Sequence, residues 1–474
     1  MRHIISLITL LTLHVVSSAQ YDSYGRFSVI PSTTGWGTEK SVRFVREGTT
    51  ATFAVVPTGA DREGLALFRY SLITGESDMS FGVGGGTFAA LPDSLQNFQI
   101  VGIRATEQGY IVFGTAVTRL NPSPLRAIAF GFTKTGDFEK NFGSDGVSVS
   151  AFPEIDSVYP ARDIPGGGDA FLAYGISRGP EVWTLSDAGE WARGVDVSLN
   201  ASTLNVVRDE QGRWLTLSVS TGDVFDVTVR RNRPDGVIDN DFGSNGQVRW
   251  TGEYSGGVVG MCARSDGSYV VVTRLGALAD PTQGRIQFLV IPDDGSRIDS
   301  SMISFNGMEE QLVPNSMSVD ADNRVLLAGM RFVQGRPLPF IARMLPSLQP
   351  DPIYGSRGVW TAPMDNLPAG VGEEPTPGES GTAYFLVNVS TGLGGRFVYL
   401  QEASEVRVGV AEETMIPRVT HALSDGSIDH LHILGFPDNT RFVDLVGRPQ
   451  DAPLPRGCWF HEQSRRIVIV PGNR

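Results

Sequence analysis

The most regular pattern in this 474-residue chain is a tight turn followed by a short run of apolar and β-branched residues. Glycine supplies the positive φ of a hairpin turn, and a continuous apolar run suits a strand that is covered on both faces. The turns fall near residues 48, 109, 168, 212, 267, 323, 381 and 464. The pattern therefore predicts eight hairpins, whose second strands contain residues 52–56, 110–114, 171–174, 214–217, 268–272, 325–328, 384–387 and 467–470.

A second pattern, which we call the aromatic–glycine motif, follows the hairpins. It consists of a turn, a small apolar pair, an acidic stretch and an aromatic residue with glycine after it, and residues 233–246 show it most clearly. An aromatic side chain can fill the space between neighbouring sheets, and the glycine beside it can form a turn or bulge. We therefore interpret the following as structural residues of a repeat: Trp36, Phe81, Gly82, Phe142, Gly143, Phe242, Gly243, Tyr354 and Gly355.

The spacing of the hairpins predicts the architecture. Most of them are 44 to 61 residues apart, and a unit of that length with about four short strands is typical of a propeller blade. We predict an all-β fold with a single β-propeller, with eight blades preferred and seven as the alternative, because residues 382–467 could contain an insertion in place of a blade.

The two ends of the chain carry complementary fragments of the repeat. The last hairpin has no aromatic–glycine motif after it, and the first such motif, at residues 24–37, has no hairpin before it. We therefore expect the N-terminal strand to join the C-terminal blade, which would close the ring and leave no open sheet edge.

The first 19 residues differ from the rest of the chain. A basic start at Arg2, a short apolar run and a small-residue cleavage site ending at Ala19 predict a secretory signal peptide. The apolar run is too short to span a bilayer, so no membrane anchor is expected. We predict a signal peptide at residues 1–19, a propeller at residues 20–474 and a location in the periplasm or outside the cell.

Composition agrees with a β-rich exported protein. The chain has 56 glycines, 41% hydrophobic residues and only 19% charged residues, which fits many short strands joined by turns. A net charge of −13 and the lack of a basic run argue against a nucleic-acid partner. Cys262 and Cys458 occupy nearly the same position in hairpins that are three blades apart, so we predict two buried thiols and no disulfide.

The combination of hairpin and aromatic–glycine motif resembles a known repeat. The sequences Asp-Gly-Ser-Ile-Asp at 425–429 and Phe-Gly followed by a second glycine at 142–146 and 242–246 are similar to the delta-60 repeat of exported bacterial proteins. The resemblance covers nearly the whole chain after residue 19. It implies export and a propeller fold, and it carries no catalytic residues that could be transferred to this chain.

Acidic turns provide candidate calcium ligands. Asp320, Asp322 and Asn323 lie in one predicted turn, and Asp239 and Asp241 in another, so each places oxygen ligands two residues apart. The alternative is that Asp and Asn occur there because their side chains bond to the backbone of tight turns. Neither segment has the distal glutamate of a complete calcium loop. We therefore expect no obligatory cofactor and keep calcium as the alternative.

A pair of histidines provides a second candidate site. His430 and His432 are two residues apart, so on a strand both rings lie on one face, and His421 is near in sequence. A zinc or copper site needs a third ligand that the sequence does not identify. The alternative is that these are exposed strand histidines without a metal.

No catalytic motif is evident. There is no Gly-x-Ser-x-Gly motif between a strand and a helix, and the three glycines at 166–168 precede a strand and not a helix. The sequence therefore favours an exported binding or scaffold protein that presents loops to a protein or glycan partner. The alternatives are a lyase-type or glycosidase-type propeller enzyme with carboxylates or His430 and His432 at the channel mouth, and a structural surface or matrix protein.

Overall fold

A computed structural model of the chain describes residues 21–22, 25–29, 41–56, 63–72, 76–119, 125–150, 157–160, 169–175, 179–194, 197, 203–221, 225–252, 256–275, 285–303, 312–333, 335–355, 358–361, 370–378, 382–390, 396–403, 442–443, 449–450, 457–461 and 466–470. Every regular element in these ranges is a β-strand, and they contain no helix that is long and apolar enough to cross a membrane. The chain divides into two compact units, Met1–Ala422 and Leu423–Arg474.

The first three sheets of the first unit are antiparallel and follow chain order. The first consists of β3 (Ser41–Glu47), β4 (Thr50–Val56), β5 (Gly64–Ser71) and β6 (Gly86–Ala90). The second consists of β7 (Leu95–Ala105), β8 (Gly109–Thr118), β9 (Leu125–Thr133) and β10 (Val147–Val149). The third consists of β11 (Ser157–Pro160), β12 (Asp169–Gly175), β13 (Gly179–Leu185) and β14 (Trp191–Arg193).

The next three sheets have the same four-stranded order. The fourth consists of β15 (Thr203–Arg208), β16 (Trp214–Thr221), β17 (Phe225–Asn232) and β18 (Gln247–Gly252). The fifth consists of β19 (Gly256–Ala263), β20 (Tyr269–Leu275), β21 (Arg285–Ile291) and β22 (Asp299–Met302). The sixth consists of β23 (Leu312–Val319), β24 (Val325–Val333), β25 (Arg336–Met344) and β26 (Val359–Thr361).

The seventh sheet combines strands from both ends of the first unit. It has the order β27 (Gly370–Pro377), β28 (Ala383–Ser390), β29 (Arg396–Ala403), β2 (Gly25–Val29) and β1 (Tyr21–Asp22). The second unit contains one described sheet, with β31 (Pro449–Gln450), β30 (Phe442–Val443), β32 (Gly457–His461) and β33 (Arg466–Val470) in that order.

All eight predicted hairpins are confirmed. In each, the predicted second strand pairs antiparallel with the strand before it, as in β3 with β4 and β32 with β33. Gly48, Gly212, Gly267 and Asn323 lie in their turns with φ of 54°, 77°, 83° and 61°. The hairpins were predictable because each depends on a local turn next to a local apolar run.

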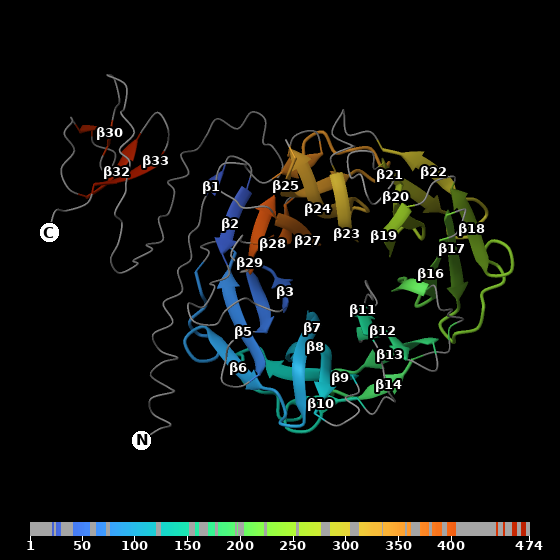
Figure 1. Cartoon of the computed structure of the whole chain (residues 1–474), viewed down its shortest axis with the longest axis horizontal. Coiled ribbons are helices and arrows are strands. Elements are labelled where there is room, and N and C mark those ends of the chain that lie inside the picture. The colour runs from blue at the N-terminus through green and yellow to red at the C-terminus, as the bar shows by residue number, and fades with distance from the viewer. Residues whose placement is uncertain are drawn as a thin grey trace. The chain divides into compact units, whose positions relative to one another are not determined.

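The first unit has the architecture of a β-propeller, as predicted. The first strands of consecutive sheets contact one another, with β3 against β7, β7 against β11, β15 against β19, β19 against β23 and β23 against β27. The sheets therefore follow one another in chain order around a common centre (Figure 1). The preference for eight blades over seven stays a prediction, because the eighth described sheet belongs to the separate second unit.

The predicted partner of the N-terminal strand is wrong. We expected it to join the last hairpin, but β2 pairs antiparallel with β29, with Phe27 opposite Gln401. The strands β27 to β29 leave one edge of the seventh sheet open, and β2 covers that edge. The first unit thus completes its last sheet with its own N-terminal strand, and the described strands of the second unit form their own sheet.

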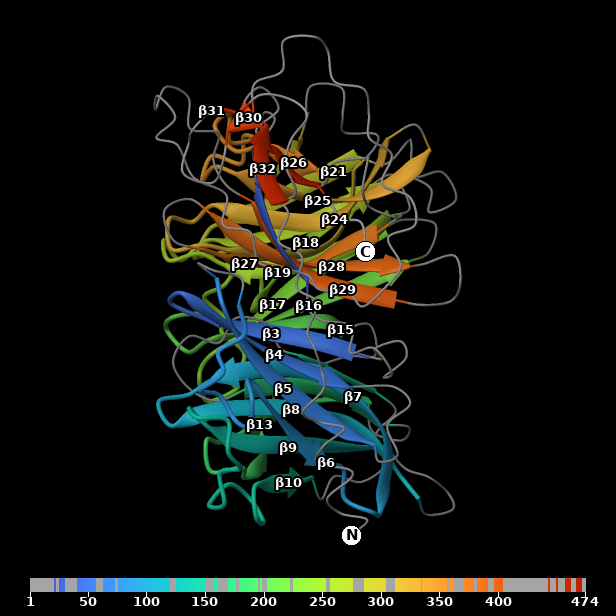
Figure 2. The same ribbon diagram turned by 90° about the vertical axis from the view of Figure 1, so that its left-hand side faces the viewer.

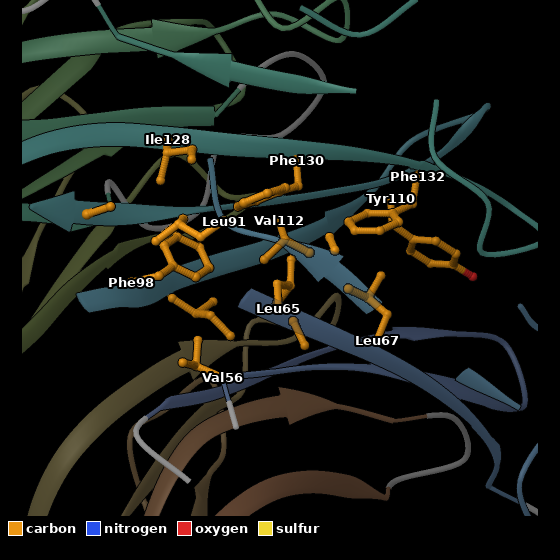
Figure 3. Packing of buried hydrophobic residues seen from close by; sticks show 14 of the residues in the cluster. Val56, Leu65, Leu67, Leu91, Phe98, Tyr110, Val112, Ile128, Phe130 and Phe132 are labelled. Atoms are coloured by element: carbon orange, nitrogen blue, oxygen red, sulfur yellow. The ribbon is translucent and has the colours of Figure 1, made fainter. Parts of the chain in front are cut away.

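Apolar side chains fill the space between neighbouring sheets. Between the first and second sheets, Leu65 and Leu67 of β5 belong to the same buried cluster as Val112 and Phe130 of the second sheet (Figure 3). Figure 2 shows β3, β4 and β5 of the first sheet side by side, seen from the edge of the unit. Sheet faces are covered on both sides, which explains the continuous apolar runs in the sequence.

The aromatic residues of the repeat lie at these junctions. Phe81, Phe142, Phe242 and Tyr354 are all buried. The ring of Phe81 packs edge to face on Tyr110 of the next sheet at 5.9 Å between centroids, and that of Phe242 packs on Tyr269 of the next sheet at 6.0 Å. Each aromatic therefore connects its own sheet to the following one. Trp36 lies outside the described residues.

The glycine after each of the three phenylalanines bonds to the next sheet. The backbone N–H of Gly82 donates to the carbonyl of Thr135 at 2.6 Å, that of Gly143 to Ala188 at 2.9 Å, and that of Gly243 to Asp294 at 2.9 Å. Each acceptor precedes a turn glycine of the next sheet. At the last of these, Gly295, a Cβ atom would lie 2.7 Å from both the Gly243 nitrogen and the Phe242 ring. The turn glycine is therefore needed for this close approach.

At three of the four aromatics, an arginine lies over the ring and bonds to an aspartate, and we call this arrangement a brace. Arg231 lies over the Phe242 ring at 4.5 Å from its centroid, and its Nε donates to Asp239 Oδ2 at 2.8 Å. The same arrangement joins Arg69, Asp78 and Phe81, and joins Arg343, Asp351 and Tyr354. In the second sheet Gly131 takes the arginine position, and a Cβ there would lie 2.5 Å from Phe142. Phe142 thus packs directly on the backbone.

We expect Phe242→Ala to lower the free energy of unfolding by about 3–5 kcal/mol, because it removes a buried ring from a junction that cannot collapse around the cavity. Val237 lies in the same loop but is exposed, so Val237→Ala should change stability by less than about 0.5 kcal/mol. Urea denaturation followed by tryptophan fluorescence measures both. Equal effects of the two substitutions would contradict the junction role of Phe242.

Gly295→Ala and Gly335→Ala form a matched pair. Both glycines have positive φ, of 65° and 78°, so each alanine variant bears the same kind of backbone strain. Only at Gly295 would the new Cβ also collide with the preceding sheet, since nothing lies within 4 Å of a Cβ at Gly335. Gly295→Ala should therefore be more destabilising by at least about 1 kcal/mol in the same urea experiment. If the two variants are equally stable, the close approach does not matter.

Candidate functional site

Where the register of the described sheets shifts, the extra residue lies on a first strand. Among the strand pairs that the structure describes, register shifts occur only between a first and a second strand, in β7, β15, β19, β23 and β27. A bulge of this kind redirects a side chain and is common at rims and binding sites. At four places a single residue of the first strand is skipped in the pairing, and we call these four residues the inner bulges: Val101, Leu204, Val259 and Asn315.

Two of the inner bulges are exposed although their neighbours are buried. Leu204 has 53% of its surface exposed, whereas Thr203 before it is fully buried. Asn315 is exposed, and Ser316 after it is buried. Leu204 offers apolar surface, and Asn315 offers an amide donor and acceptor. An exposed leucine at the innermost strand is unexpected for packing alone and marks this region as a candidate binding surface.

A third inner bulge is tied to the neighbouring sheet through its backbone. The side-chain Nε of Arg43, on β3, donates to the carbonyl of Val101 at 3.3 Å, and its Nη1 donates to the carbonyl of Val42 at 2.8 Å. Arg43 thus links the first strands of the first and second sheets. The inner bulges are built on rigid, hydrogen-bonded strands, which is how a binding surface keeps its shape.

The described first strands do not gather acid–base groups. Of the side chains described on them, Glu47 is the one carboxylate, and it forms an ion pair with Lys134 of the second sheet. Within the described ranges no group of three His, Cys, Asp or Glu side chains could hold a metal ion. The described part of the centre is therefore chemically suited to contacts and hydrogen bonds, and it provides no pair of carboxylates for acid–base catalysis.

The predicted calcium ligands are engaged in a hairpin turn. Asp320 Oδ1 accepts the backbone N–H groups of Asp322 and Arg324 at 3.0 and 2.9 Å, and its Oδ2 accepts Arg324 Nε at 2.6 Å. Asp322 Oδ2 pairs with Arg324 at 2.9 Å, and Asn323 Oδ1 accepts the N–H of Ser265 in the preceding sheet at 2.9 Å. This is the turn chemistry that the sequence offered as the alternative, and calcium binding there stays a prediction.

The structure describes some of the other predicted site residues and not others. His421, His430 and His432 lie outside the described residues, so the metal site proposed there stays a prediction. Asp239 bonds to Arg231 in the brace described above. Cys262 is buried in the apolar cluster between the fifth and sixth sheets.

A polar cluster, which we call the Tyr269 cluster, joins the fourth and fifth sheets and is buried except for Asp293, whose side chain is half exposed. It comprises Asp209, Arg213, Arg231, Tyr269 and Asp293. The Tyr269 hydroxyl donates to Asp209 Oδ2 at 2.9 Å and accepts from Arg213 Nη2 at 2.8 Å. Arg213 also pairs with Asp209 at 2.6 Å and with Asp293 at 2.5 Å. Arg231 donates to both the backbone carbonyl and the carboxylate of Asp293.

Burial and charge set the protonation states in this cluster. Burial raises the pKa of Tyr269, and the Asp209 carboxylate adds to this effect, so the phenol stays protonated. Burial acts to raise the pKa of Asp293, but the hydrogen bond and charge of Arg213 and the charge of Arg231 outweigh it and hold that pKa below its ordinary value. Asp293 is thus ionised and Tyr269 neutral near neutral pH.

The Tyr269 cluster forms a structural junction between two sheets. Tyr269 has no exposed surface, so a substrate cannot reach its hydroxyl, and a phenol with a raised pKa is a poor base. A related set at the junction of the first two sheets contains Glu47, Arg69, Tyr110 and Lys134, where Arg69 Nη1 donates to the Lys134 carbonyl at 2.7 Å. The repetition of the cluster at a second junction supports a role in holding sheets together.

Sequence patterns missed the braces and the Tyr269 cluster. A spacing in the sequence could have revealed the braces. An aspartate lies three residues before the aromatic, and an arginine lies eight or nine residues before that aspartate, as in Arg231, Asp239 and Phe242. The inner bulges left no such signal, because a bulge depends on the register between two strands and not on one residue type.

Comparison with known proteins identifies no family. No protein-family model matches the chain, and no curated protein matches its sequence. Several solved structures are similar in fold. The polysaccharide lyase Uly1 has a TM-score of 0.49 at 11% identity, with 76% of this chain and 89% of that chain covered.

Two further structures show the range of the likeness. Virginiamycin B lyase from Staphylococcus aureus has a TM-score of 0.40 at 12% identity, with 77% of this chain and 95% of that chain covered. The β-propeller domain of the Trilobed protease from Pyrococcus furiosus has a TM-score of 0.38 at 11% identity, with coverages of 65% and 80%. At TM-scores below 0.5, none of these likenesses supports an inference about activity.

We expect Asp293→Asn to weaken the dependence of stability on pH in acid. The pKa of Asp293 is lowered in the folded state, so its stabilising contribution is present above the unfolded-state pKa of about 3.9 and is lost as the pH falls through the lower folded-state pKa. The variant should therefore lose less stability than the wild type as the pH falls below about 4. Urea denaturation at several pH values measures this, and parallel curves for the two proteins would show that Asp293 is not coupled to the arginines.

Proposed function

We propose that this chain is an exported binding or scaffold propeller that presents one end of its sheets to a protein or glycan partner. The observation that carries this proposal is a division between the two ends of the sheets. One end carries the aromatic–glycine contacts between sheets, and the other carries connections that are free of this motif. The predicted signal peptide supports export, and the resemblance to the delta-60 repeat agrees with it.

The two ends are defined by strand direction. Neighbouring strands in a sheet are antiparallel. The first-to-second and third-to-fourth connections therefore emerge at the same end of the sheet, which we call the turn end. The connections between the second and third strands, and from one sheet to the next, emerge at the opposite end, which we call the loop end. The aromatic–glycine motifs and the Tyr269 cluster all belong to the turn end.

Connection lengths vary at both ends. At the turn end, the hairpin connection is residues 48–49 in the first sheet and residues 209–213, 264–268 and 320–324 in the fourth, fifth and sixth sheets. At the loop end, the connection between the second and third strands ranges from residues 334–335 in the sixth sheet to residues 276–284 in the fifth. Variable connections on a repeated scaffold are where binding specificity usually resides.

The inner bulges add surface that the repeat does not need for packing. Leu204 is the second residue of β15, next to the connection that enters the fourth sheet at the loop end, and Asn315 lies in the middle of β23. Together they offer an apolar contact and an amide, the mixture that binding sites for proteins and glycans use. The enzyme and structural-protein alternatives have no comparable support among the described residues.

A matched pair of variants tests the proposal. Leu204 and Val237 are exposed apolar residues with nearly equal exposure, 53% and 51%, and they lie at the loop end and the turn end. The mature chain, from residue 20 onward, would be screened on glycan and protein arrays, and the affinity for its best partner measured with each variant. We expect Leu204→Asp to weaken binding at least tenfold, because a charge replaces an apolar contact, and Val237→Asp to leave it unchanged.

Two results would contradict the proposal. One is that neither variant changes the affinity, which would place the binding surface elsewhere. The other is that only Val237→Asp weakens binding, which would assign the partner to the turn end. Melting temperatures of both variants must match that of the wild type, so that a loss of binding is not a loss of fold.

A further inference from the structure

Arg264 departs from the repeat at a position where other sheets have an acidic residue. In the fourth and sixth sheets, the residue that follows the first strand is Asp209 or Asp320, and the arginine four residues later pairs with it. In the fifth sheet, Arg264 occupies the aspartate position, and Ser268 occupies the arginine position. The carboxylate that the repeat places here is therefore missing, and a positive charge takes its place.

The Arg264 side chain is buried with one edge of its guanidinium group unpartnered. Only 6% of the residue is exposed, and its Nε and Nη2 atoms are buried and have no hydrogen-bond partner. The nearby Asp266 is engaged elsewhere, because its Oδ1 accepts the N–H and the hydroxyl of Ser268 at 2.9 and 2.6 Å. Burial lowers the pKa of Arg264, and the charges of Cys262 and Asp266 only partly oppose this effect. A buried charge without a hydrogen-bonded counter-charge is unfavourable, and proteins normally supply a partner.

The side chain lies on the face of the fifth sheet that packs on the sixth. Two positions before it, Cys262 shares a buried cluster with Leu312 and Met317 of β23. Two further positions back, a Cβ at Gly260 would lie 3.1 Å from the Met317 side chain. Alternation along the strand places Arg264 on the same face, at the turn end of the junction between the fifth and sixth sheets.

The two unpartnered atoms form one edge of the guanidinium group. Elsewhere in this protein the same edge holds a carboxylate. Arg69 contacts Asp78 Oδ2 with Nε at 2.8 Å and with Nη2 at 2.7 Å. Arg343 contacts Asp351 Oδ2 with the same two atoms at 2.9 and 2.8 Å. At Arg264 this edge is present and buried, and its acceptor is absent.

From these observations we propose that Arg264 binds the carboxylate group of a ligand at the turn end of the junction between the fifth and sixth sheets. The two N–H groups of the guanidinium edge match the two oxygens of a carboxylate, which makes such a pair stronger and more specific than a single hydrogen bond. The ligand would supply the counter-charge that Asp209 and Asp320 supply in the neighbouring sheets. This site is separate from the loop-end surface and does not depend on it.

Acetate is the probe for this site. We expect the melting temperature of the mature chain at neutral pH to rise with acetate concentration and to saturate at roughly 2 °C or more above the value in sodium chloride of equal ionic strength. Saturation-transfer NMR on the acetate methyl group gives a second readout that does not depend on stability. The affinities for glucuronate and glutarate, each compared with that for acetate, identify the source of the carboxylate. Glucuronate represents a sugar acid, and glutarate represents an acidic side chain.

Variants identify the residue responsible. Arg264→Gln and Arg264→Met should lose the acetate-specific shift and the NMR signal, and Arg264→Lys, which keeps the charge but not the guanidinium edge, should bind acetate at least tenfold more weakly. In chloride alone, Arg264→Met should be as stable as the wild type or more stable, because it removes an unpaired buried charge. Arg324→Gln is the matched control, since Arg324 already pairs with Asp320, and it should keep the acetate response.

Three results would overturn the proposal. The first is that the wild type shows no acetate-specific shift and no NMR signal. The second is that the Arg264 variants respond to acetate as the wild type does. The third is that phosphate or sulfate stabilises the protein as strongly as acetate at equal concentration, which would show a general anion effect and not a carboxylate site.

Discussion

The fold depends on one contact, in which an aromatic ring of one sheet packs against a turn of the next sheet. Phe242 lies in the loop after the third strand of its own sheet, and its ring packs on Tyr269 of the next. Gly243 then donates its backbone N–H to the carbonyl just before Gly295, the turn glycine that covers the ring. Because an aromatic and two glycines are needed at each such junction, the sequence repeats them.

Polar groups strengthen these junctions at the same end of the sheets. Arg231 stacks on the Phe242 ring, pairs with Asp239 in its own sheet and reaches the Asp293 carbonyl in the next. Such buried ion pairs contribute little net stability compared with apolar packing, but they are costly to leave incomplete. They therefore favour one arrangement of neighbouring sheets. The consequence for function is that structural contacts occupy the turn end, whereas the loop end is free of the aromatic–glycine motif.

The sequence allowed the local part of this architecture to be predicted. All eight hairpins were predicted because a turn residue, usually glycine, and an apolar run are adjacent in sequence, as in Gly267 and β20. The partner of the N-terminal strand was predicted wrongly, because the pairing of β2 with β29 depends on which sheet edge remains open in three dimensions. The brace of Arg231 and Asp239 was missed for a similar reason, since its residues meet only after a strand and a loop have formed.

The candidate sites were less predictable than the fold. Asp320 and Asn323 were chosen for their oxygen atoms, but those atoms bond within a hairpin and to the preceding sheet. Leu204 gave no signal, because a bulge is a property of strand register. Arg264 was equally hidden, since a sequence does not show that an arginine in a turn is buried and lacks its acidic partner.

Hydrogen exchange at the motif glycines would test the account most directly. Measured by mass spectrometry or NMR on the mature chain, the backbone amides of Gly82, Gly143 and Gly243 should exchange as slowly as those of the central strands, although all three lie in loops. This protection follows from their hydrogen bonds to the next sheet. If these amides exchange as fast as those of exposed turns, the aromatic–glycine motif does not hold the sheets together.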